Sequence, residues 1–121
     1  MKLLAIIFTA LVAIIHVGIL ILEMFFWDPI GGKIFLMTPE ATKASALVAM
    51  NQGLYNGFLA AGLFWGLIAK KVDVKIFFLA CVIIAAIFGA ITVKPAIILS
   101  QGAPAIIALI FVLLSLRSKA N

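Results

Sequence analysis

Apolar side chains fill most of this chain in four long runs, which are separated by short segments of charged and turn-forming residues. The runs cover about residues 3–26, 45–69, 75–93 and 95–116. Each approaches or exceeds the roughly 20 residues that an α-helix needs to cross the ~30 Å hydrocarbon core of a bilayer. The pattern predicts an all-α protein, an integral membrane four-helix bundle in which residues 1–121 form a single transmembrane domain.

The connection between the first two runs contains signals for the end of one helix and the start of the next. Residues 27–32, Trp-Asp-Pro-Ile-Gly-Gly, are rich in turn formers and predict a turn that leaves the first span. Thr38, Pro39 and Glu40 are typical of a helix start, because they place a cap, a proline and an acid in order. The second helix is therefore expected to begin near Pro39, outside the bilayer.

The fourth run is interrupted by Ser-Gln-Gly-Ala-Pro at residues 100–104. Pro104 lacks the N–H that would bond to the carbonyl of Ser100 in a regular helix. The part after Pro104 spans only ~20 Å at about 1.5 Å per residue, so it cannot cross alone. We expect span four to be kinked near Gly102/Pro104, with a re-entrant segment over residues 95–104 and a half-helix as the alternative.

Basic residues lie at the ends of the apolar runs, which is where topology signals belong. With four spans, six of them fall on the side of the two termini and three on the other side. Cytoplasmic loops are enriched in Lys and Arg, so both termini are expected in the cytoplasm. This placement also makes the net charge of +5 a poor argument for nucleic-acid binding. The six residues are Lys2, Lys70, Lys71, Lys75, Arg117 and Lys119, and the three are Lys33, Lys43 and Lys94.

Polar residues inside the first run follow one helical stripe. Thr9, His16 and Glu23 are seven residues apart, so each lies within about 20° of the next around a helix axis, and Trp27 lies close to the same line. Polar groups are costly in lipid unless they pair or line a wet cavity. The stripe therefore predicts a face of the first span that is turned away from lipid.

The second run contains a cluster of hydrogen-bonding side chains. Asn51, Gln52, Tyr55 and Asn56 cover an arc of about 140°. Two G-x-x-x-G pairs, at residues 53 and 57 and at residues 62 and 66, would let other helices approach closely. The second span is therefore expected to be the central helix, with protein on most of its sides.

All of this polarity falls in the outer half of the predicted bundle, which indicates a polar pocket that opens, or can open, toward the outside. A purely structural role is the alternative to a binding site. His16 and the amides could form hydrogen bonds between helices, and Glu23 could be solvated by headgroups or paired with Lys33 or Lys94. In the functional alternative, His16 and Glu23 exchange protons or contact a ligand. The predicted ligand-binding residues are His16, Glu23, Trp27, Asn51, Gln52, Tyr55, Asn56 and Gln101.

Catalytic and metal-binding motifs give no further direction. The chain lacks H-E-x-x-H, a phosphate-binding glycine loop and a nucleophile elbow, so an enzyme is not favoured and no catalytic residue is assigned. One histidine and one cysteine, Cys81, are too few for an ordinary metal site, and neither a metal nor a cofactor is expected.

The motifs H-x6-E-M-F-x-W, from His16 to Trp27, and N-Q-G-x-Y-N-G-F-x-A-x-G, from Asn51 to Gly62, carry a family resemblance. The chain resembles, over essentially its whole length, small bacterial membrane proteins grouped as domain of unknown function 1304. The resemblance implies a four-span, multi-pass protein of the bacterial cytoplasmic (inner) membrane, and it brings no established activity. The family's characteristic residues correspond to His16, Glu23, Trp27, Asn51, Gln52, Tyr55 and Asn56.

Three functions remain open at this point. The favoured one is a transporter or accessory permease that binds a small polar or cationic ligand in the outer-half pocket. The second is a membrane enzyme that acts on a lipid or isoprenoid headgroup, with His16 and Glu23 as acid and base. The third is a structural or assembly subunit without a ligand. The lipid bilayer and further copies of the chain, in a dimer or larger homo-oligomer, are the expected partners.

Overall fold

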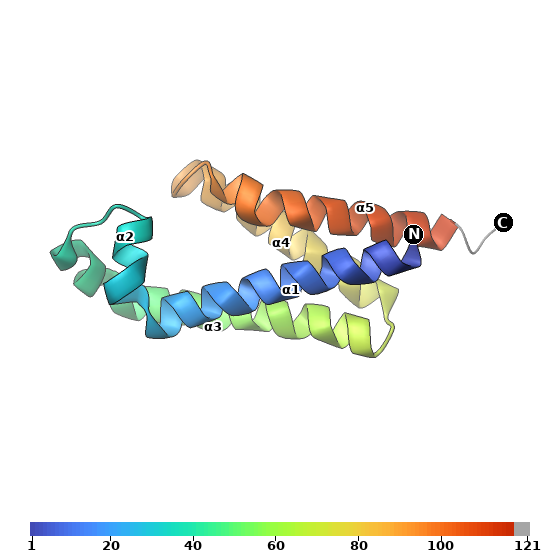
Figure 1. Cartoon of the computed structure of the whole chain (residues 1–121), viewed down its shortest axis with the longest axis horizontal. Helices are drawn as coiled ribbons and strands as arrows, with labels where there is room; N and C mark the ends of the chain where they lie inside the picture. Colours follow the sequence, from blue (N-terminus) through green and yellow to red (C-terminus); the bar gives the residue numbers. More distant parts are fainter. Residues whose placement is uncertain (118–121) are drawn as a thin grey trace. The chain divides into compact units, whose positions relative to one another are not determined.

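The structure, a computed structural model, describes residues 1–117, so Lys119 lies outside the described range. Within that range every regular element is helical, and the prediction of an all-α protein is confirmed (Figure 1). The elements are α1 (Lys2–Phe25), the π-helix η1 (Trp27–Gly31), α2 (Gly32–Ile34), α3 (Pro39–Ile68), α4 (Val72–Thr92), the π-helix η2 (Ile98–Gly102) and α5 (Ala103–Arg117).

Three helical segments are long and apolar enough to cross a membrane: α1, α4, and the continuous stretch Ile98–Arg117 that joins η2 to α5. They indicate an integral membrane protein. The 30-residue helix α3 is not among them. It contains the amides Asn51, Gln52 and Asn56, which lower its mean hydropathy.

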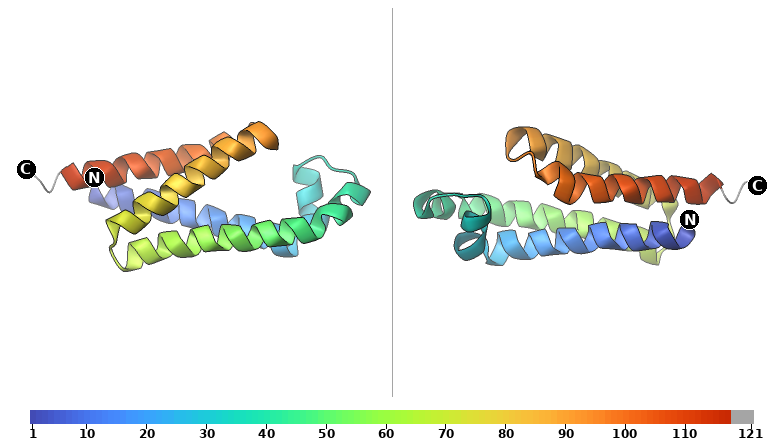
Figure 2. Two further views of the ribbon diagram at one scale, coloured as in Figure 1. Left: turned by 180° about the vertical axis from the view of Figure 1, so that it is seen from behind. Right: turned by 45° about the horizontal axis from the view of Figure 1, so that its top comes forward.

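The chain divides into two compact units. The first contains residues 1–15 and the chain from Leu59 onward, in which α4 and α5 lie side by side and are joined at the η2 end (Figure 2). Its core is built from small and branched side chains, and Phe8 stacks on Phe111 with ring centroids 5.3 Å apart. Small residues let helices approach closely where lipid offers no hydrophobic drive to associate. The buried core residues of this unit are Ala5, Val12, Ala13, Leu63, Leu79, Val82, Ala105, Ala108 and Val112.

A tight turn joins α3 to α4 in this unit. The N–H of Lys71 bonds to the carbonyl of Gly66 and that of Lys70 bonds to the carbonyl of Leu67, with Lys70 at φ 55°. This is a Schellman arrangement, which ends a helix and satisfies its last carbonyls. A Cβ on Gly66 would lie 2.7 Å from Cγ of Lys75, so the glycine lets α4 approach α3 closely, as the spacing predicted.

The interruption in the fourth apolar run is present as the π-helix η2. Residues 94–99 first form tight turns, with i→i−3 bonds such as that from the N–H of Ile97 to the carbonyl of Lys94. The chain then widens into η2 and continues as α5, in which Pro104 is the second residue. Gly102 is buried, and a Cβ there would lie 2.8 Å from Cδ1 of Ile98. The irregularity predicted near Gly102/Pro104 is therefore a π-helical segment that continues directly into α5.

The second unit, residues 16–58, contains the end of α1, η1, α2 and the start of α3. The predicted turn after the first span is helical instead, which corrects the sequence-based prediction. Pro29 is tolerated because it lies in the first turn of η1, where no intrahelical N–H is required. The two glycines act by close packing: a Cβ on Gly31 would lie 2.5 Å from the Trp27 ring, and one on Gly32 would lie 2.5 Å from Oγ1 of Thr42.

The start of the second long helix is as predicted. Helix α3 begins at Pro39, and Oγ1 of Thr38 accepts a hydrogen bond from the N–H of Ala41 at 3.2 Å. Glu40 lies in the first turn, where a negative charge interacts favourably with the helix dipole. The cap, the proline and the acid thus act as the sequence indicated.

Candidate functional site

The centre of the candidate site is a hydrogen bond between α1 and α3. Nδ2 of Asn56 donates to Oε2 of Glu23 at 2.9 Å, and the same nitrogen donates to the backbone carbonyl of Gln52 at 3.1 Å. Within residues 1–117, Asn56 is the one hydrogen-bond partner that Glu23 has, and no basic side chain forms an ion pair with its carboxylate. A half-buried carboxylate is therefore held in place by a neutral group.

The helices approach closely at this point because α3 has glycine there. A Cβ on Gly53 would lie 2.7 Å from Cγ of Met24, 3.1 Å from Cβ of Glu23 and 3.2 Å from the carbonyl oxygen of Leu20. A Cβ on Gly57 would lie 2.5 Å from Cδ1 of Leu20. The G-x-x-x-G pair thus packs on α1, as predicted, and it brings the amide of Asn56 within reach of the carboxylate.

The polar stripe of α1 is turned away from the surface, which confirms the prediction from its seven-residue spacing. Thr9 and His16 are 0% and 1% exposed, and Glu23 is half-buried. His16 and Glu23 lie two turns apart on the helix, about 10 Å at ~1.5 Å per residue.

Asn51 and Tyr55 belong to a different face of α3. Both are exposed, as is Gln52, and the ring of Tyr55 meets that of Phe58 edge-on at 5.8 Å. Around the helix axis, Asn51 and Tyr55 are about 140° and 100° from Asn56 at ~100° per residue. The predicted residues of α3 therefore divide into Asn56, which bonds to Glu23, and an outward face that carries Asn51, Gln52 and Tyr55.

The exposure of α3 also corrects the expectation of a central helix. Leu47, Phe58 and Trp65 are 79%, 54% and 52% exposed, so one flank of the helix is uncovered along its length. Helical periodicity predicts the angles between these residues, but it does not predict which arc the neighbouring helices cover.

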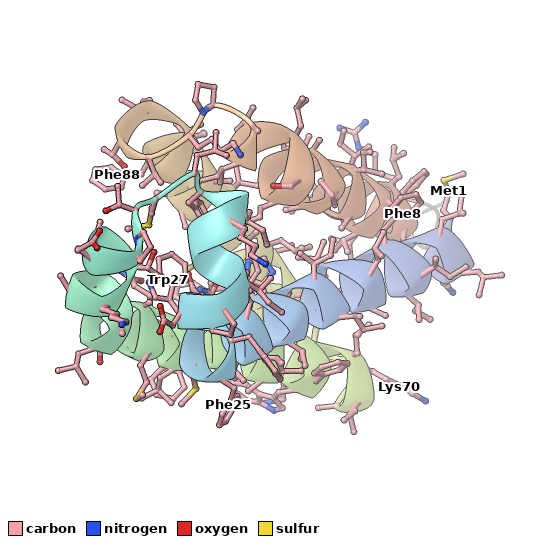
Figure 3. The ribbon with its side chains drawn as sticks, turned by 60° about the vertical axis from the view of Figure 1, so that its left-hand side comes forward. Met1, Phe8, Phe25, Trp27, Lys70 and Phe88 are labelled. Atoms are coloured by element: carbon pink, nitrogen blue, oxygen red, sulfur yellow. The ribbon has the colours of Figure 1, made fainter. Side chains whose placement is uncertain are left out.

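Trp27 stabilises the connection between α1 and α3 through a hydrogen bond and a ring contact. Its Nε1 donates to Oγ of Ser45 at 3.0 Å, and its ring packs on Phe35 with centroids 5.4 Å apart. Figure 3 shows the Trp27 ring turned toward the first part of α3, whereas Phe25 points outward. Trp27 thus fastens η1 to α3 in a position separate from the Glu23–Asn56 hydrogen bond. Gln101, the last predicted residue, lies half-buried in η2 of the other unit.

A hollow of about 570 Å³ lies beside this connection. Opposite charges, Asp28 and Lys33, line it together with apolar side chains and Thr42. None of the eight predicted ligand-binding residues is among its lining residues. The sequence signal that would have found it is the pair of opposite charges, Asp28 and Lys33, around the adjacent glycines of the thirteen-residue connection between α1 and α3. The lining residues are Asp28, Pro29, Gly32, Lys33, Leu36, Met37, Pro39 and Thr42.

The described residues contain no group of three or more His, Cys, Asp and Glu side chains that could hold a metal ion. The arrangement instead offers one carboxylate, that of Glu23, and the amide of Asn56 at the α1–α3 contact. Such groups can accept hydrogen bonds from a small cation and donate to a polar neighbour.

Comparison with known proteins places the chain in a family. Residues 10–113 match the family described as "Protein of unknown function (DUF1304)". The chain belongs to this family. It is also 34% identical over 115 residues to a protein named "Uncharacterized protein YpaA" from Lactococcus lactis subsp. lactis (strain IL1403), and the match covers 91% of this chain and 97% of that protein. No solved structure matches the chain.

Both comparisons agree with the resemblance that the H-x6-E-M-F-x-W and N-Q-G-x-Y-N-G-F motifs predicted. The matched range includes the residues of both motifs, from His16 to Gly62. The family is described only by its unknown function, so membership confirms the resemblance and adds no activity.

Proposed function

We propose that this DUF1304 member is a multi-pass protein of the bacterial cytoplasmic membrane with four spans, α3 being the span that composition alone does not identify. At about 1.5 Å per residue, the 30 residues of α3 measure about 45 Å, which exceeds the ~30 Å hydrocarbon core. The last 20 or so residues, ending at Ile68, suffice to cross. The first third of α3 then stands outside the core, with η1 and α2.

Within this frame, the protein binds a small cationic ligand at Glu23 and acts as a transporter or accessory permease. The observation that carries this function is the half-buried carboxylate of Glu23, whose hydrogen-bond partner is the neutral amide of Asn56. A carboxylate inside a membrane span is costly unless a positive charge compensates it. The described chain supplies no such charge by ion pairing, so an exchangeable cation is the natural complement.

The test is ligand binding by the purified full-length protein. Ethanolamine, putrescine and choline serve as probes, and thermal unfolding is followed with each. We expect at least one of the three probes to raise the midpoint of thermal unfolding. Glu23→Gln should weaken this binding about tenfold to a hundredfold, because hydrogen bonds to charged groups contribute roughly 1.5–3 kcal/mol. Gln at this position still offers Asn56 an acceptor oxygen, so the helix contact is retained.

Glu40→Gln is the matched control, since Glu40 is an exposed acid in the first turn of α3. This variant should bind as the wild type does. The proposal fails if none of the three probes shifts the midpoint, or if Glu23→Gln and Glu40→Gln bind equally well. Uptake of a radiolabelled bound probe into proteoliposomes then separates transport from binding alone.

The exposed polar face of α3 favours a second candidate, an assembly subunit. Asn51, Gln52 and Tyr55 are exposed on a helix that is otherwise largely apolar. Amide side chains both donate and accept, so such a face can pair with the same face of another copy. Asn51→Leu with Gln52→Leu should then dissociate a purified oligomer, measured by light scattering in detergent, without changing probe binding at Glu23. An unchanged mass would reject this candidate.

The enzyme alternative is the weakest of the three. It requires His16 and Glu23 to act on one substrate group, and their separation along α1 is about 10 Å. General acid and base must each reach the reacting atoms within hydrogen-bond distance.

A further inference from the structure

The connection between α1 and α3, in the second unit, exposes four large apolar side chains. Phe26, Ile30 and Ile34 follow one another at intervals of four residues and are 45%, 44% and 47% exposed, and Leu36 is 90% exposed. The N–H of Ile30 bonds to the carbonyl of Phe26 at 3.0 Å, so the backbone is already helical between these two. Side chains four residues apart on helical backbone lie on one side of it. The first three residues therefore form a stripe along η1 and α2.

Other residues of the same segment pack on the start of α3. Trp27 donates to Oγ of Ser45, and the buried Gly31 lies against the Trp27 ring. The buried Gly32 lies against Thr42, whose Oγ1 would be 2.5 Å from an added Cβ. These contacts fix the segment on α3 without using the stripe. The stripe is therefore left exposed on a segment whose position is set by other residues.

Leu36 ends this segment in a backbone conformation that leucine does not favour. Its φ is 54°, and the N–H of Met37 bonds to the carbonyl of Gly32 at 2.8 Å, as in a Schellman turn. The left-handed position of such a turn is usually glycine, because a Cβ crowds the following carbonyl oxygen there. A leucine that is 90% exposed gains little from its own chain in return. The interaction that compensates for it is therefore expected outside the chain.

The end of α1 places this segment at the membrane surface. At about 1.5 Å per residue, the 24 residues of α1 measure about 36 Å, which exceeds the ~30 Å hydrocarbon core. Phe26 follows α1 directly, so it falls in the headgroup layer, which is roughly 5–7 Å deep on each side. Figures 1 and 3 show η1 and α2 turning away from the axis of α1 and running across its end. The segment therefore runs along the membrane surface.

We propose that the connection is an interfacial anchor, whose stripe and Leu36 insert at the boundary between headgroups and acyl chains of the leaflet where α1 ends. Interfacial helices bury their apolar face about 5–10 Å into this boundary. Residues 26–38 carry one acid, Asp28, and one base, Lys33, so their charges cancel and the insertion rests on apolar contact with neutral lipid. The anchor requires that α1 crosses the membrane, and it is independent of cation binding at Glu23.

The test measures lipid contact in the full-length protein, reconstituted into phosphatidylcholine vesicles. A nitroxide spin label is attached to Ile30→Cys, Ile34→Cys or Leu36→Cys, each in a Cys81→Ser background, and its collisions with oxygen and with a water-soluble nickel complex are measured by electron paramagnetic resonance. Oxygen concentrates among acyl chains, so these labels should collide more with oxygen than with nickel. Asp28→Cys is the matched control, because Asp28 is an exposed polar residue of the same segment, and its label should show the reverse order.

Three results would overturn the proposal. Preferential collision with nickel at the three apolar positions would place them in water. Poor access to both reagents would mean that protein covers them: dipolar broadening between labels would then identify a second copy, and its absence another part of the same chain. An equal preference for oxygen at Asp28→Cys would remove the distinction between the two kinds of side chain.

If the cysteine variants fail to fold, the wild-type protein decides. A phosphatidylcholine with a photoreactive group next to its glycerol backbone labels side chains at the boundary between headgroups and acyl chains. Labelled peptides that include residues 26–36 support the anchor, and labelling confined to other segments refutes it.

Discussion

At the scale of single residues, Thr9 is the polar group of the α1 stripe that the described structure leaves without a partner. It is 0% exposed, and its Oγ1 makes no hydrogen bond in the described chain. Burying a hydroxyl costs desolvation free energy, and without a hydrogen-bond partner no interaction offsets that cost. The hydroxyl of Thr9 therefore lowers the free energy of unfolding.

Thr9→Val is expected to stabilise the protein by about 1 kcal/mol, because valine has nearly the same shape and removes the unsatisfied hydroxyl. The measurement is the free energy of unfolding in a mixed micelle with increasing denaturant. Thr92→Val is the matched control, since Thr92 is exposed and its Oγ1 donates to the carbonyl of Phe88 at 2.8 Å. A Thr9→Val protein that is less stable than the wild type would mean that the hydroxyl has a partner in the folded protein.

Helical periodicity was enough to predict which residues of α1 share one face. The seven-residue spacing correctly indicated that Thr9 and His16 are buried, since they share one line on a helix. It could not tell that Asn51 and Tyr55 are exposed while Asn56 bonds to Glu23. Periodicity fixes only relative angles, and the absolute orientation of α3 follows from the glycines that contact α1.

At the scale of elements, glycine decides which helix faces meet. Gly53 on α3 lies under Glu23 and Met24, and the backbone carbonyl of Leu20 would be 3.2 Å from an added Cβ. A side chain can move, but a helix backbone moves only as a whole. Gly18 on α1 provides the contrast, because nothing lies within 4 Å of a Cβ added there.

Gly53→Ala is therefore expected to destabilise the protein by about 1–3 kcal/mol, the usual cost of overpacking. Gly18→Ala should leave stability unchanged or raise it by up to ~1 kcal/mol, because alanine favours a helix interior. Both changes add the same methyl group, so the difference in their unfolding free energies isolates the contact. Equal effects would show that α1 and α3 do not pack through Gly53.

The limits of element prediction are clearest in residues 27–34. The sequence Asp-Pro-Ile-Gly-Gly is typical of a turn, yet the chain forms η1 and α2 there. The same residue types serve two purposes: Pro29 fits the first turn of a helix, and Gly31 and Gly32 admit the side chains of Trp27 and Thr42. Those partners are tertiary contacts, so a local pattern could not reveal them. The start of α3 was predictable because its cap, Thr38, acts on the adjacent residues.

At the scale of the whole molecule, the number of spans depends on α3 alone. The acids Glu40 and Asp73 lie in the first turns of α3 and α4, and both are exposed. If α3 crosses the membrane, these two positions lie on opposite sides; if it does not, they lie on the same side. Acidic residues contribute little to the positive-inside rule, so replacing them should leave the topology intact.

The prediction is that Glu40→Cys reacts with a membrane-impermeant maleimide in intact spheroplasts, whereas Asp73→Cys reacts only after permeabilisation. Both are made in a Cys81→Ser background, which removes the single native cysteine. Labelling of both positions from the same side would leave α3 on the membrane surface and would also place Glu23 and Asn56 outside the hydrocarbon core. The cost of a buried carboxylate, on which cation binding rests, would then disappear, because water could solvate Glu23 directly.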